Sequence, residues 1–304
     1  MNENEHRKIT ISTSTVDQLL ASVDADKAQD DRVLAQLAKL ASVNQEALLA
    51  VVYRVPRLSG LGDPDDLMKR RRVRRELVGY LTHCVPGLIS ILEAWTEPLS
   101  RSGKSDREAE FRAELAAEIL GDIGEPAVAA VPALIRAMHA DPRWMGEISG
   151  PALGKIGSEE AIRELNHIWF SGWDRKLCES CHGALMDLGE RAHPVLLRII
   201  DETDPVDRAR ALHSLRAAHY PEKDLAALAQ KLLGDGSIPV IETAINVLAG
   251  FDDPTQAASA LDKLREISAD EEHYFERTRI EAAKAVTRIS EQLSRSSESI
   301  EKEK

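Results

Sequence analysis

Apolar residues recur along this chain with the three- and four-residue spacing of amphipathic helices, and short polar breaks separate the runs. Several runs end on a leucine with a glycine shortly after it. These endings read ILGDIG, ALGKIG, ALMDLG and VLAGFD at residues 119–124, 152–157, 184–189 and 247–252, with a degenerate copy, SLRAAH, at 214–219. The intervals are 33, 32, 30 and 33 residues between the anchors Leu120, Leu153, Leu185, Leu215 and Leu248. This period predicts a solenoid of stacked helix pairs.

The breaks between runs contain residues that end and begin helices. Glycine takes the left-handed conformation that closes a helix, and Asp-Pro places a capping oxygen before a proline in the first turn. Asp-Pro occurs at residues 141–142, 204–205 and 253–254. We expect helix pairs at 64–83 with 84–96, 106–121 with 125–139, 142–155 with 158–170, 173–188 with 190–201, 204–217 with 221–234, and 236–250 with 254–267, and a final helix at 270–293.

This pattern predicts an all-α protein, an α-solenoid of about six to eight antiparallel helix pairs. The solenoid is expected to span 16–293, with an N-terminal cap at 16–63 and repeats at 64–293. Polar composition predicts disordered ends at 1–15 and 294–304. The segment TEPLSRSGKSDR at 96–107 is rich in Ser, Gly and charge and is expected to form a loop.

Composition narrows the functional classes. The chain has 39 Lys and Arg against 51 Asp and Glu, a net charge of −12 that opposes nucleic acid and anionic membranes unless a local basic patch prevails. Three cysteines argue against a disulfide framework, and the N-terminus has no apolar signal segment. We therefore expect a cytoplasmic protein without a membrane span.

In several predicted pairs the second helix has Ala, Val or Pro near its start and continues as an apolar helix. Examples are EPAVAAVPALIRAM at 125–138, ERAHPVLLRII at 190–200 and CVPGLISIL at 84–92. These stretches resemble HEAT repeats of the short bacterial kind also seen in phycobilin lyases, over about residues 64–290. The resemblance implies a protein-binding scaffold in most cases and an enzyme or a DNA-binding protein in a minority.

The string CESCH at Cys178–His182 is the sharpest local match to a chemical motif. It is typical of covalent haem attachment in an exported protein, and with His193 it provides four possible zinc ligands. The repeat favours a packing role instead. Cys181 lies four residues before its anchor leucine, where the other repeats have small residues: Ala116, Ser149, Ala211 and Ala244. We expect packing, with metal and haem as alternatives and no cofactor assigned.

Two further clusters are candidates for binding. One short run contains six basic residues: Lys69, Arg70, Arg71, Arg72, Arg74 and Arg75. They either contact nucleic acid or an acidic protein, or they form a solvated helix face. Three tryptophans, Trp144, Trp169 and Trp173, gather near one repeat junction. Tryptophan is enriched at interface hot spots but also fills irregular cores.

No catalytic signature is present: neither a phosphate-binding loop nor a His-Glu pair nor GxSxG occurs. The first hypothesis is therefore a scaffold that binds a protein partner through the solenoid groove. The alternatives are a nucleic-acid binder that uses Lys69–Arg75 and an accessory lyase or other ligand-handling repeat protein.

Overall fold

The computed structural model describes residues 35–36, 39, 78–79, 81–102, 107–169 and 174–302. Over these ranges every extended element is a helix, which confirms the all-α prediction. None of these helices is both long and apolar enough to cross a bilayer. The chain divides into two compact units, residues 1–158 and 159–304. The expected disordered segment 1–15 and nearly all of the expected cap 16–63 lie outside the described residues.

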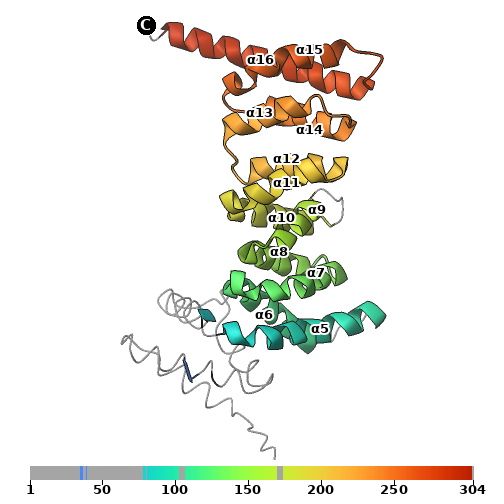
Figure 1. The fold of residues 1–304 in the computed structure, drawn as a ribbon, viewed down its shortest axis with the longest axis vertical. Helices are drawn as coiled ribbons and strands as arrows, with labels where there is room; N and C mark the ends of the chain where they lie inside the picture. Colours follow the sequence, from blue (N-terminus) through green and yellow to red (C-terminus); the bar gives the residue numbers. More distant parts are fainter. Residues whose placement is uncertain are drawn as a thin grey trace, which may run out of the picture. The chain divides into compact units, whose positions relative to one another are not determined.

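Among its described residues, the first unit contains two layers of paired helices (Figure 1). Its elements are η1 (Thr82–Cys84), α5 (Val85–Ser102), α6 (Arg107–Ile123), η2 (Glu125–Ala130), α7 (Val131–Ala140) and α8 (Met145–Ile156). Helix α5 packs on α6, and α7 packs on α8. The layers are joined because α6 also packs on α8 and α5 on α7. Fully buried leucines, among them Leu120, Leu134 and Leu153, fill the core.

The second unit continues the same construction over four layers (Figure 1). Its elements are α9 (Glu159–Trp169), α10 (Arg175–Leu188), η3 (Gly189–Ala192), α11 (His193–Glu202), α12 (Pro205–Ala217), α13 (Glu222–Leu232), α14 (Ile238–Ala249), η4 (Pro254–Ala260), α15 (Leu261–Ala269) and α16 (Glu276–Lys302). The layers are α9 with α10, α11 with α12, α13 with α14, and α15 with α16. Helices α10, α12, α14 and α16 form a continuous row of contacts through the unit.

The observed helix pairs are shifted by one helix along the chain relative to the expected pairs. We expected 106–121 to pair with 125–139, but the more extensive packing joins α7 to α8, and likewise α11 to α12. The physical reason lies in the connections. After α6, α10 and α14 a short 3-10 segment (η2, η3 or η4) carries the chain to the next layer. The capped turns at Asp174 and Asp204 return the chain within a layer instead.

The recurring Leu-x-x-x-Gly ending places its glycine at a positive φ, although only Gly157 has the ψ of a left-handed helix, +27°, and Gly124 and Gly189 have ψ of −139° and −130°. Gly124, Gly157 and Gly189 have φ angles of +72°, +65° and +52°. In the degenerate copy His219 occupies the same place with φ +55°, and the Tyr220 N–H then donates to the Leu215 carbonyl at 2.9 Å. At these four anchors the residue four positions after the leucine therefore has a positive φ, even where it is not glycine; at the Leu248 anchor the helix ends at Gly250 with φ −98° instead.

Two helices extend further than the polar composition suggested. Helix α5 covers the first part of the expected loop 96–107 and ends at Ser102, because Trp95 and Thr96 are buried and the Thr96 hydroxyl donates to the Leu92 carbonyl. Helix α16 continues through most of the expected tail 294–304 to Lys302. Once a helix has formed, each further residue that joins it gains one backbone hydrogen bond, so extension is easier than initiation. This tail also contains no Gly or Pro, which would interrupt the helix.

Candidate functional site

Some predicted site residues lie outside the described part of the chain. They are the whole basic run, Lys69, Arg70, Arg71, Arg72, Arg74 and Arg75, and also Trp173. Their proposed binding roles therefore remain predictions from sequence.

The CxxCH string lies on α10, which starts at an N-cap formed by Asp174. The Asp174 carboxylate accepts hydrogen bonds from the backbone N–H of Lys176 at 2.8 Å and of Leu177 at 3.3 Å. Cys181 follows on the inward face and is completely buried. Burial, reinforced by Cys178 and Glu164, raises the pKa of the Cys181 thiol to about 12. Cys181 is therefore a neutral packing thiol at physiological pH and a poor nucleophile.

The other members of the string contact α9. The Cys178 thiol donates to the Ile168 carbonyl at 3.5 Å. The His182 ring packs on the Trp169 indole, with centroids 4.0 Å apart and a tilt of 40°. Partial burial lowers the pKa of His182, so its neutral form is favoured. These contacts fasten α10 to α9 within their layer.

His193 is directed away from the string. Its Nε2 donates to the Ala218 carbonyl at 2.8 Å, and its ring meets Tyr220 edge to face at 5.0 Å. Throughout the described residues, no three His, Cys, Asp or Glu side chains gather as metal ligands would. The proposed zinc set Cys178, Cys181, His182 and His193 is thus not assembled.

Trp144 lies in the first unit, at the turn between α7 and α8. Asp141 fixes this turn, because its carboxylate accepts the Trp144 backbone N–H at 3.0 Å and its carbonyl accepts the Gly146 N–H at 3.2 Å. The Trp144 side chain is nevertheless 49% exposed. Core packing is the alternative interpretation of this tryptophan, but it does not account for the exposed part of the side chain.

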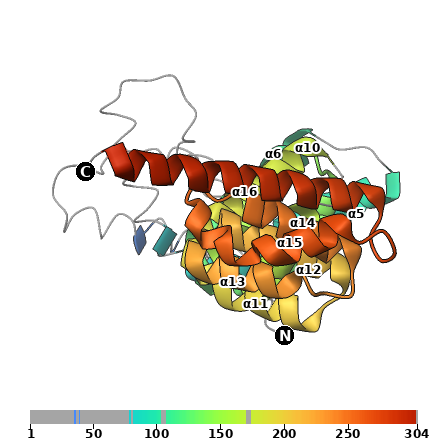
Figure 2. The same ribbon diagram turned by 90° about the horizontal axis from the view of Figure 1, so that it is seen from above.

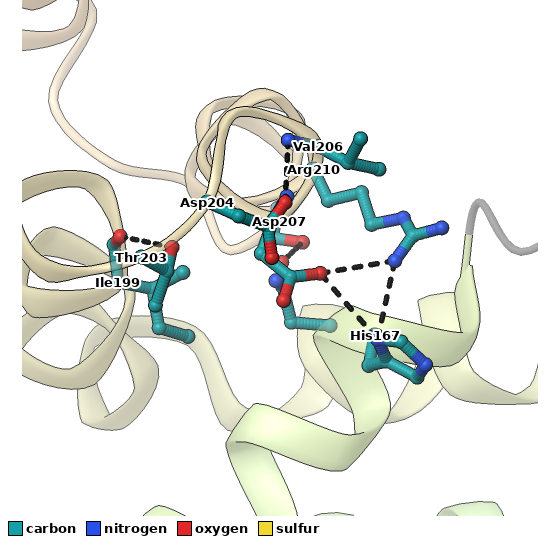
Figure 3. A network of polar contacts seen from close by, with 9 residues as sticks. His167, Ile199, Thr203, Asp204, Val206, Asp207 and Arg210 are labelled. Carbon is teal, nitrogen blue, oxygen red and sulfur yellow. Dashed lines mark hydrogen bonds and ion pairs between the residues drawn. The ribbon is translucent and has the colours of Figure 1, made fainter.

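A polar network at the α11–α12 turn reaches back to α9 (Figure 3). Arg210 Nη1 donates to Asp207 Oδ1 at 2.9 Å and lies 3.2 Å from Nδ1 of His167. Asp207 Oδ1 is 3.4 Å from that same nitrogen. Arginine only donates hydrogen bonds, so a neutral His167 accepts from Arg210, whereas a protonated one would donate to Asp207.

The turn that supplies Asp207 is itself capped. The Asp204 carboxylate accepts the backbone N–H of Val206 at 2.8 Å and of Asp207 at 3.3 Å, and these bonds hold the pKa of Asp204 below its ordinary value. Thr203 donates to the Ile199 carbonyl at 2.6 Å (Figure 3). The network contains no nucleophile beside the imidazole, so its geometry supports a link between two layers rather than catalysis.

Sequence reasoning identified Asp204 as a cap but missed His167, Asp207 and Arg210. These residues are separated by 40 to 43 positions between α9 and α12. The same holds for the buried bond from Ser214 to Asn166, at 2.7 Å across 48 positions. No local spacing marks such pairs, because they depend on how successive layers are offset.

Comparisons with known proteins add little beyond the fold. No protein-family model and no curated protein matches the chain. One similar solved structure is the complex of CpcE and CpcF of phycocyanin lyase from Nostoc sp. PCC7120, at 18% identity and TM-score 0.29, covering 95% of this chain and 98% of that one. Another is a HEAT-like repeats protein from Thermococcus onnurineus NA1, at 14% identity and TM-score 0.30, covering 93% and 98%.

At these TM-scores the likeness carries no argument about function. The fold assignment rests on the layers themselves: short paired helices, a leucine-anchored ending with a positive φ in four copies, and a row of second helices in contact within the second unit. Together these features are those of an all-α helical repeat protein built from stacked helix pairs.

Proposed function

We propose that this chain is an interaction scaffold that binds a protein partner, and that the Trp144 surface takes part in the contact. The Trp144 surface consists of Arg143, Trp144 and Glu147, which are all exposed around the start of α8. A helical repeat array offers extended surface without needing a reactive pocket.

The observation that carries the proposal is the half-exposed indole of Trp144 on a turn that is already ordered. Trp is among the residues that contribute most to protein interfaces, and a fixed turn reduces the entropy lost when a partner binds. The hydrogen bonds from Trp144 and Gly146 to Asp141 provide that order before any partner arrives.

The alternative classes receive less support from the described residues. Cys181 is buried with a raised pKa that keeps its thiol neutral, and His193 donates to the Ala218 carbonyl, and both observations support a packing role for the CxxCH string. Nucleic-acid binding through Lys69–Arg75 and ligand handling as an accessory lyase remain alternatives, and each has its own test: a salt-dependent DNA-binding assay and a visible absorbance spectrum.

Quantitative affinity purification from the native host tests the proposal. We would compare the wild-type chain with Trp144→Ala and with a matched control, Val128→Ala, whose side chain is 51% exposed on η2 of the same unit. We expect at least one protein to be captured by the wild type and the control but lost with Trp144→Ala.

The captured protein would then be purified and titrated calorimetrically against all three chains. Loss of a hot-spot side chain costs about 2 kcal/mol or more, so Trp144→Ala should weaken binding by roughly tenfold or more. Equal affinity of Trp144→Ala and wild type for every captured protein would refute a role for this surface.

A further inference from the structure

Helix α16 closes the second unit as its last element. It packs on α14 and α15 and extends well beyond α15, as Figure 2 shows. Its buried positions are Thr278, Ala282, Ala285 and Ile289, which form one face. The positions outside this face are mostly polar, as the solvent-facing side of an amphipathic helix should be.

Two apolar side chains break this rule. Phe275 is 73% exposed just before α16, and Ile280 is 44% exposed one turn into the helix. They are two of six large apolar residues that are exposed among the described residues, and they lie only five positions apart. Single exposed apolar residues are ordinary, but two of them at the start of a helix whose other outward positions are mostly polar suggest a contact surface.

The turn that presents Phe275 is ordered. The Asp270 carboxylate accepts the backbone N–H of Glu272 and of His273, each at 3.0 Å. Arg279 of α16 donates to Glu271 of the same turn at 2.6 Å. The Phe275 carbonyl in turn accepts the Arg279 N–H at 3.1 Å. Phe275 therefore occupies a defined position from which it can engage a partner without a large loss of entropy.

A basic stripe runs beside Ile280 along α16. Arg277, Lys284, Arg288 and Arg295 are all exposed, and at about 100° per residue they fall within about 20° of one line along α16. Arg277 and Lys284 lie three residues before and four after Ile280, on the same side of the helix. Lys284 pairs with Glu281 and Arg295 with Glu291. Arg277 and Arg288 make no ion pair within the described residues.

From this juxtaposition we infer that the α16 surface, comprising Phe275, Arg277, Ile280, Lys284 and Arg288, binds an acidic amphipathic peptide segment of a partner protein. Phe275 and Ile280 provide the apolar anchors, and the three cations complement Asp and Glu side chains on the segment. This surface belongs to the second unit and does not depend on the Trp144 surface.

Charge complementarity favours a peptide over a nucleic acid. Glu281 and Glu291 lie close to the stripe and would repel a continuous polyphosphate, whereas a peptide can place its own acids opposite the cations alone. Exposed Phe275 and Ile280 also have no role in a phosphate contact. The expected ligand therefore combines Asp or Glu with Leu, Phe or Trp at helical spacing.

A random-peptide display library, selected on the full-length chain, provides the probe. We expect the enriched peptides to combine acidic and large apolar residues. The most enriched peptide, synthesised with a fluorophore, should bind with an anisotropy change that Ile280→Ser and the double variant Arg277→Glu/Lys284→Glu each weaken by about tenfold. The matched controls Val206→Ser and Lys231→Glu, at exposed positions elsewhere in the unit, should bind as the wild type does.

Three kinds of result would overturn the inference. One is a peptide result: enrichment of peptides that lack acidic residues, or equal binding of the selected peptide by the wild type and the α16 variants. Another is tight binding of fluorescent DNA that Arg277→Glu/Lys284→Glu abolishes and Ile280→Ser leaves intact, which would identify a polyanion site. The third is dimerisation in sedimentation experiments that Ile280→Ser abolishes, which would identify a second copy as the occupant. None of these results bears on the Trp144 surface.

Discussion

The substitution Gly121→Ala tests the packing of the first unit most directly. A Cβ at position 121 of α6 would lie 2.7 Å from Cα and 2.8 Å from Cβ of Ala152 on α8. Ordinary contact begins at 3.4 Å, so the two helices would have to separate by about 0.7 Å. Overpacking of this kind costs about 1–3 kcal/mol, and the better helix propensity of Ala recovers at most about 1 kcal/mol. We expect a net loss of about 1–2 kcal/mol in the free energy of unfolding.

Gly183→Ala is the matched control, since Gly183 is also a helical glycine but a Cβ there would have nothing within 4 Å. That variant should gain about 0.5–1 kcal/mol from helix propensity alone. Urea unfolding followed by far-ultraviolet circular dichroism would measure both, with separate transitions fitted if the units unfold independently. A Gly121→Ala chain as stable as the wild type would show that α6 and α8 do not approach as closely as described.

Three further predictions concern single features. His219→Gly should raise the free energy of unfolding by about 1 kcal/mol, because His219 bears a left-handed φ of +55°, and thermal melts that show a loss would refute this strain. With its pKa raised to about 12, the Cys181 thiol should resist maleimide between pH 7 and 9 until the chain is unfolded. Cys181→Ala should lower the free energy of unfolding by less than about 1 kcal/mol. One zinc per chain, lost in that variant, would contradict the packing role. The basic run Lys69–Arg75 should give no tight DNA binding at about 150 mM salt, and tight, salt-sensitive binding that Arg71→Glu/Arg72→Glu/Arg75→Glu abolishes would place nucleic-acid recognition ahead of the scaffold.

Helix positions were largely predictable, because their signals are local. The expected helices at 106–121, 142–155 and 204–217 correspond to α6, α8 and α12 with ends that differ by a few residues. Proline, glycine and capping Asp act within one turn of their own position, so a single segment of sequence contains the whole signal. The ends of α5 and α16 were misjudged, because polar composition does not stop a helix that tertiary contacts have already started.

Candidate sites were less predictable, because a residue type indicates a chemistry without indicating its neighbours. The CxxCH string suggested metal or haem, yet the fold directs His193 to Ala218 and stacks His182 on Trp169. The repeat register, which placed Cys181 in a small-residue slot, was the better guide, because burial at that slot recurs at Ala116, Ala211 and Ala244.

The sequence by itself therefore determined that the chain is an array of short helices, where most of them end, and which positions of each repeat are buried. Only the tertiary structure decided which helices share a layer, and that His167 meets Asp207 and Arg210. It also decided that Phe275 and Ile280 remain exposed on the last layer. The physical reason is that helix ends depend on backbone bonds within one turn, whereas contacts across 25 to 48 residues depend on the rotation from one layer to the next.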